Sequence, residues 1–194
     1  MLPGLAVQSL MLASMATGIG LDADVRNGIF DRFRSMPIAR TAPLIGQIAA
    51  DVCRYVMALV LLFGFGMILG FRTSGNAFAV LGGCLLIMFF SFSVCWIAAL
   101  VGLLAKSPAS VQALSLALVL PLTFGSNVFV PIAQLSGRLQ AWVKINPVTQ
   151  LSSAVRALML RQPVGHWVLF SLLWTIGLLA VFAPLAGGAY RRRI

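Results

Sequence analysis

The stretch from Ala77 to Ala105 reads AFAVLGGCLLIMFFSFSVCWIAALVGLLA and contains no charged side chain. A helix needs roughly 20 apolar residues to cross the hydrocarbon core of a bilayer, and this stretch exceeds that length. Its apolar residues are not confined to one face, as they would be on the surface helix of a soluble domain. The stretch therefore predicts a helix that spans a membrane.

The composition of the whole chain agrees with this prediction. Of the 194 residues, 60% are hydrophobic and only 9% are charged, whereas ordinary globular proteins carry about 25% charged residues. Such a chain cannot cover its surface with polar groups, so lipid must replace water around much of it. We predict an all-α, multi-pass integral membrane protein of the cell membrane, with residues 1–194 forming one transmembrane domain.

Four more stretches are long and apolar enough to span a bilayer. Polar residues dilute the first one, for which a signal peptide is the competing interpretation, but no basic segment precedes it and we favour a membrane helix. Ser107 and Pro108 form an N-cap and first-turn pair at the start of the fourth span. In all, the predicted spans are residues 2–21, 44–71, 77–105, 111–130 and 167–186.

The basic residues between the spans predict the orientation of the chain, because cytoplasmic loops carry an excess of Lys and Arg. Alternate loops place eight on one side, namely Arg26, Arg32, Arg34, Arg40, Lys106, Arg191, Arg192 and Arg193. The other side receives five, namely Arg72, Arg138, Lys144, Arg156 and Arg161. We predict that the first side is cytoplasmic. The net charge of +10 is divided between both sides, which argues against nucleic acid as a partner.

The chain offers few groups for metal, disulfide or nucleotide chemistry. It has one His and no Glu, and Cys53, Cys84 and Cys95 are dispersed through apolar stretches. No Lys follows a Gly, so the sequence has no phosphate-binding loop of the G-x-x-x-x-G-K type. The sequence predicts no metal site and no cofactor, and energy from ATP would have to be supplied by another protein.

The segment from Asp22 to Met36 has the pattern of an amphipathic helix. Its apolar residues recur at helical spacing, at Val25, Ile29, Phe33 and Met36. Asp22 is the predicted N-cap, and Pro37 is predicted to end the helix. Two interpretations are open from the pattern alone. The helix lies on anionic lipid with its Arg side chains at the headgroups, or it docks on a protein.

Two short helices are predicted on the outer side, between the fourth and fifth spans. Asn146 and Pro147 form an N-cap and first-turn pair that opens a helix through about Leu160. Another short helix precedes it, over residues 135–144. We expect these two helices to dip into the outer leaflet or to rest on it.

Two ionisable residues lie within the predicted spans. Asp51 and Arg54 are three residues apart in the second span, so their side chains share one helix face and can pair. One interpretation is a role in a substrate or proton pathway. The interpretation that we favour is structural, because the pair lies within about two turns of the cytoplasmic end, where it fixes helix depth and docks against the first loop.

Small residues at a spacing of four indicate where membrane helices approach closely. Gly66 and Gly70 have this spacing in the second span, and Ala98 and Gly102 have it in the third. Such pairs are common in membrane helices, so they predict close packing without specifying a partner.

Four motifs carry a resemblance to a known family. They are GIFDRFRSMPIAR at 28–40, LIGQIAAD at 44–51, PLTFGSNVFVP at 121–131 and NPVT at 146–149. In this order they resemble the permeases of type-2 ABC exporters, and most of all the daunorubicin-resistance permease family. The resemblance covers essentially the whole chain, and the first and third motifs are specific.

This resemblance implies six membrane helices per subunit, two such subunits, and two separate ATP-binding subunits on the cytoplasmic face. The chain shows five spans, and its first residues, Met1 to Gly4, resemble the start of the family's second helix. The N-terminal elbow and first helix of the family are therefore expected to be missing from this chain.

The resemblance also assigns roles to particular segments. In the family, the segment after the second helix bears a coupling helix that engages the ATPase, which implies a contact through Arg26, Phe30, Arg32, Phe33, Arg34 and Arg40. The outer helix at 146–160 resembles the re-entrant hairpin that caps the exit pathway. Substrate would pass between two permeases, where the implied pathway residues are Phe124, Asn127 and Phe129.

We therefore expect the permease subunit of an ATP-driven exporter in the plasma membrane. It would move drugs or other hydrophobic compounds by alternating access, with a separate ATP-binding subunit and a second permease copy, and would catalyse no reaction itself. One alternative is a membrane scaffold, or a truncated remnant that no longer transports. Another is an intramembrane enzyme, for which Asp51 and Arg54 are the ionisable candidates at membrane depth.

Overall fold

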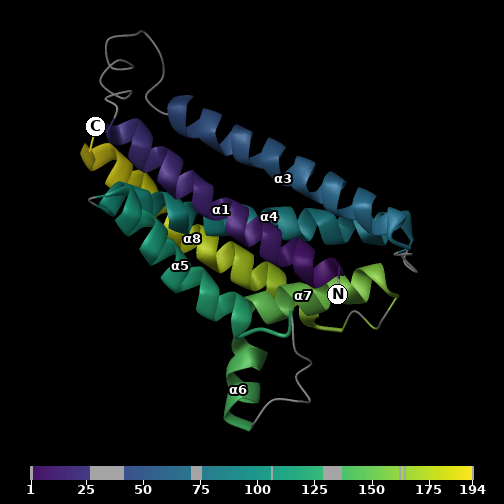
Figure 1. Cartoon of the computed structure of the whole chain (residues 1–194). Helices are drawn as coiled ribbons and strands as arrows, with labels where there is room; N and C mark the ends of the chain where they lie inside the picture. Colours follow the sequence, from purple (N-terminus) through teal and green to yellow (C-terminus); the bar gives the residue numbers. More distant parts are fainter. Residues whose placement is uncertain are drawn as a thin grey trace.

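The computed structural model describes residues 2–26, 42–70, 76–105, 107–128, 137–161, 163 and 165–193. Within these ranges the chain is helical and contains no strand, as the sequence predicts. The helices are α1 (Leu2–Arg26), α3 (Ala42–Ile68), α4 (Ala77–Leu104), α5 (Pro108–Phe124), α6 (Gly137–Ile145), α7 (Pro147–Met159) and α8 (Trp167–Arg193). Figure 1 shows the long helices lying side by side in one bundle.

Four of the described helices are long and apolar enough to cross a bilayer. Their apolar segments are Leu2–Ala23, Ala49–Ile68, Ala77–Leu104 and Trp167–Ala189. The predicted fourth span corresponds to α5, which has 17 residues and is therefore about 25 Å long. This is shorter than the hydrocarbon core of roughly 30 Å. Instead of continuing to residue 130 as predicted, α5 ends at Phe124 and the chain turns at 125–128.

The predicted boundary at Asp22 is wrong. Asp22 is not the N-cap of a new helix, because α1 continues through it without interruption to Arg26. The sequence LDADVR at 21–26 contains no Gly or Pro that would end a helix, so α1 extends beyond its apolar segment. The remainder of the predicted amphipathic helix, at 27–36, falls outside the described residues.

The long helices alternate in direction, so each end of the bundle gathers a different set of helix starts and ends. One end gathers the end of α1, the start of α3, the junction between α4 and α5 and the end of α8 (Figure 1). The opposite end gathers the start of α1, the end of α3 and the short helix α7 (Figure 1). This is the alternation on which the two-sided count of basic residues depends.

The helix α4 lies at the centre of the bundle and contacts α1, α3, α5, α7 and α8. Its approach to α1 is closest where small residues meet, at Gly18 of α1 and at Ala98 and Gly102 of α4. A Cβ atom added to Gly102 would fall on the Gly18 carbonyl, and one added to Gly18 would fall on the Ala98 carbonyl. The close approach predicted from the Ala98 and Gly102 spacing is confirmed.

Two helices begin where the sequence predicts, namely α7 after Asn146 and α5 after Ser107. The Asn146 side chain caps α7 by accepting a hydrogen bond of 2.9 Å from the Val148 backbone N–H. The Ser107 hydroxyl caps α5 in the same way, at 3.1 Å from the Ser110 backbone N–H. Most residues of α7 are buried, including the polar Thr149. A helix of 13 residues thus sits inside the bundle rather than on its surface.

We predict that Gly102→Ala lowers the thermal stability of the purified chain in lipid nanodiscs. The added methyl group would push the α4 backbone away from α1, and overpacking of this kind costs about 1–3 kcal/mol. The measurement is the midpoint of thermal unfolding.

The matched control for this substitution is Gly82→Ala, on the same helix. A Cβ atom added to Gly82 meets nothing within 4 Å. Its midpoint should stay at the wild-type value or rise slightly, because Ala favours helix more than Gly does. Equal shifts for the two variants would show that the close approach of α1 and α4 does not limit stability.

Candidate functional site

A buried carboxylate connects three helices of the bundle. Asp51 of α3 is 0% exposed. Its Oδ2 accepts a hydrogen bond of 2.6 Å from the Thr17 hydroxyl of α1, and its Oδ1 accepts one of 2.7 Å from Arg54 Nη1. The Cys95 thiol of α4 lies 3.3 Å from both Asp51 Oδ2 and Thr17 Oγ1. We call Thr17, Asp51, Arg54 and Cys95 the Asp51 cluster.

The Asp51 carboxylate carries a negative charge that would be costly to leave unpaired inside a membrane. The other members of the Asp51 cluster stabilise this charge. The ion pair with Arg54 joins neighbouring turns of α3, as the spacing in the sequence allows. The Arg54 side chain is 45% exposed, so the guanidinium lies at the surface of the bundle while the carboxylate lies inside. Both charges therefore belong to one structural unit that begins in α3 and reaches into α1 and α4.

A second group of polar contacts attaches the end of α5 to α7. The Asn127 side chain donates a hydrogen bond of 2.8 Å to the Ser153 hydroxyl and accepts one from the Ser152 hydroxyl. The Arg156 guanidinium donates bonds of 2.9 and 3.0 Å to the backbone carbonyls of Asn127 and Val128. Burial lowers the pKa of Arg156 from its ordinary value. The turn after α5 is thus held by four side chains of α7, since the Thr149 hydroxyl also accepts a bond of 3.4 Å from the Asn127 backbone N–H.

Asn146 completes the attachment of α5. Its amide donates bonds of 2.8 Å to the carbonyls of Leu122 and Gly125, in the last turn of α5 and the residue after it. Carbonyls at a helix end have no partner within the helix. The same side chain that caps the start of α7 therefore also satisfies the end of α5, and the two helices are joined at one residue.

The structure places some of the predicted site residues and leaves others outside its described ranges. Of the predicted coupling residues, Arg26 is the last residue of α1, and the remaining five lie outside the described residues. Phe129 also lies outside them. Phe124 is 65% exposed at the end of α5, whereas Asn127 is 7% exposed and bonded to α7. The coupling and pathway roles stay predictions.

The partners of Asp51 and Asn127 were missed from the sequence. Thr17 and Cys95 lie on helices other than that of Asp51, and neither is at helical spacing from it in the sequence. Ser152 and Arg156 carried a weak signal, because they are four residues apart on α7 and so share one helix face. That signal indicates a polar stripe on α7 without indicating what it faces.

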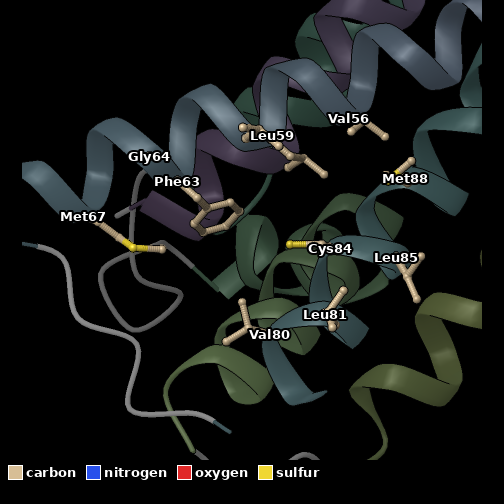
Figure 2. Close-up of a pocket in the computed structure, with 11 residues that line it drawn as sticks. Val56, Leu59, Phe63, Gly64, Met67, Val80, Leu81, Cys84, Leu85 and Met88 are labelled. Carbon is tan, nitrogen blue, oxygen red and sulfur yellow. The ribbon is translucent and has the colours of Figure 1, made fainter. Parts of the chain in front are cut away.

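Two apolar cavities lie between the helices. The larger, of about 600 Å³, separates α3 from α4, and its walls include Val56, Leu59, Phe63, Val80, Cys84 and Met88 (Figure 2). The smaller, of about 310 Å³, lies among α4, α5, α6 and α8 and includes the indoles of Trp142 and Trp174. Such surfaces suit lipid chains or hydrophobic compounds. Among the described residues, no three His, Cys, Asp or Glu side chains gather as metal ligands.

These features define a multi-pass membrane protein, built from apolar helices with polar contacts between them. The family of proteins described as ABC-2 type transporters matches residues 1–160. The chain therefore belongs to the membrane components of ABC transporters, and the resemblance predicted from its motifs is confirmed. No solved structure matches the chain.

The chain is also similar to named drug-resistance permeases. It is 40% identical over 193 residues to the daunorubicin resistance ABC transporter permease protein DrrB1 of Streptomyces coeruleorubidus, covering 99% of this chain and 68% of that protein. It is 30% identical over 156 residues to the doxorubicin resistance ABC transporter permease protein DrrB of Mycobacterium tuberculosis, covering 80% of this chain and 54% of that protein.

We predict that Arg156→Met destabilises the chain by about 2 kcal/mol, because it removes charged hydrogen bonds to two carbonyls of the turn after α5. Thermal unfolding in lipid nanodiscs measures the loss. Lys144→Met is the control, since it removes one positive charge and leaves a side chain of similar length at an exposed position of α6. An Arg156→Met midpoint no lower than that of Lys144→Met would contradict the prediction.

Proposed function

We propose that the chain is the transmembrane subunit of an ATP-driven exporter, which moves drugs or other hydrophobic compounds across the plasma membrane by alternating access. The observation that carries this proposal is the 40% identity to a daunorubicin resistance permease, which extends over 193 residues. The apolar cavities between α3 and α4 and among α4, α5, α6 and α8 support it, because they offer the chemistry that a hydrophobic compound needs.

A separate ATP-binding subunit supplies the energy in this proposal. It docks on the segment that joins α1 to α3, through Arg26, Phe30, Arg32, Phe33, Arg34 and Arg40. The arrangement of the bundle supports a shared cytoplasmic end, because α1 ends and α3 begins at the end where α8 also finishes in Arg191, Arg192 and Arg193 (Figure 1).

A second permease copy forms the other wall of the substrate pathway in this proposal. The exposed ring of Phe124 lies where the pathway would reach the end of α5. Asn127 contributes by fixing the turn after α5 to α7, and Phe129 follows it in the sequence. The pathway is therefore formed by the ends of α5 in the two copies, each held in place by its own α7.

The test of this proposal is export by the chain produced together with its ATP-binding subunit. Inverted membrane vesicles should take up daunorubicin when ATP is added, and the fluorescence of the drug reports its uptake. The double variant Arg32→Glu, Phe33→Ala should abolish uptake, since it reverses a charge and removes an aromatic side chain of the proposed docking segment. When the chain carries an affinity tag and is purified by it, the ATP-binding subunit should be recovered with the wild-type chain but not with the double variant.

The control for the docking segment is Arg138→Glu, which reverses a charge predicted to lie on the opposite side of the membrane. This variant should retain uptake and the ATP-binding subunit. A wild-type chain that gives no ATP-dependent uptake would contradict the proposed export and favour the scaffold or the remnant. An unchanged yield of the ATP-binding subunit with the double variant would contradict the docking site.

A further inference from the structure

The Asp51 cluster occupies equivalent positions on the two helices that flank the segment at 27–41. Thr17 lies nine residues before the end of α1 at Arg26, and Asp51 lies nine residues after the start of α3 at Ala42. A helix rises by 1.5 Å per residue, so each side chain is about 14 Å along its helix from that segment. Their hydrogen bond of 2.6 Å therefore joins α1 and α3 at the same depth.

The cluster also reaches the central helix α4. Cys95 of α4 lies 3.3 Å from Asp51 Oδ2. Gly18, the neighbour of Thr17, takes part in the close approach of α1 to α4. One turn of α1 thus contributes both the hydrogen bond to α3 and the backbone contact with α4.

Beyond the cluster, an apolar cavity lies between α3 and α4. The cavity of about 600 Å³ separates them from Val56 to Met67 of α3, and Figure 2 shows the apolar side chains that face this space from both helices. Apolar surfaces can slide past each other at little cost, whereas separating a buried carboxylate from its donors is strongly unfavourable. Displacement of α3 therefore reaches α4 through the Asp51 cluster rather than through the cavity walls.

We propose that Asp51 is a positioning residue for energy coupling, whose carboxylate makes α1 and α3 move with α4 as one body when the segment at 27–41 is displaced. This role rests on the proposed function, in which an ATP-binding subunit displaces that segment. The residue touches no substrate and acts by transmitting the movement to the helices around it.

The test compares transport with ATP hydrolysis in the complex of the chain with its ATP-binding subunit. Thr17→Val keeps the shape of the side chain and removes the hydroxyl that donates to Asp51. Daunorubicin transported per ATP hydrolysed should fall by roughly tenfold, which is the scale of losing a hydrogen bond to a charged group. Hydrolysis itself should stay within about twofold of wild type, because the ATP site lies on the other subunit.

Three further variants separate positioning from a structural role. Thr17→Ser restores the hydroxyl and should restore the ratio of transport to hydrolysis. Ser93→Ala removes a different buried hydroxyl of α4, which donates 3.1 Å to the Thr175 carbonyl outside the cluster, and should leave the ratio unchanged. Asp51→Asn should lower the ratio as Thr17→Val does, and Thr17→Val keeps the test decisive if Asp51→Asn does not fold.

The outcomes distinguish this inference from the proposed function. A wild-type ratio in Thr17→Val, or an equal loss in Thr17→Val and Ser93→Ala, would overturn the role of Asp51 while leaving export intact. The role of Asp51 would also be overturned if Thr17→Val lowered ATP hydrolysis and transport by the same factor and lowered the unfolding midpoint as well, because the variant would then only destabilise the chain. Absence of ATP-dependent uptake by the wild-type chain would overturn export itself.

Discussion

The hydrocarbon core of a bilayer offers no water, so each polar group of a spanning chain needs a partner within the protein. The helices satisfy the backbone, and several polar side chains find their partners on other helices. Asp51 obtains donors from α1, α3 and α4, and the end of α5 obtains donors from α7. These contacts join elements that are distant in the sequence, so the same constraint that favours helices also decides how the helices are attached.

Packing divides the helices into an inner and an outer group. More than half of the apolar segment of α1 is buried and half of that of α4, against 28% for α3 and 11% for α8. The glycine contacts between α1 and α4 and the burial of α7 form the interior. The exposed faces of α3 and α8 are apolar, as expected of surfaces that meet lipid or another membrane subunit.

The sequence predicted the features that depend on local patterns. The length of the apolar stretches predicted the positions of the long helices, and the pair Asn146 and Pro147 predicted the start of α7. The end of α5 was placed too late because the apolar stretch was followed past Gly125, which is the C-cap of α5 and a local stop signal. The partners of Asp51 were missed because no local pattern joins them to it, since Thr17 and Cys95 lie 34 and 44 residues away.

The helix α1 is a common packing partner of α3 and α4, so a small number of contacts with α1 can fix the positions of both helices. Both α3 and α4 pack on α1, and the larger cavity lies between α3 and α4. At one end of α3 the attachment to α1 is the hydrogen bond between Thr17 and Asp51, and near the other end Gly66 lies against the Leu2 side chain. A rotation of α3 about its axis would break the first contact before the second, because a hydrogen bond depends on direction and an apolar contact does not. The polar end of α3 is therefore fixed in orientation more strictly than its apolar end.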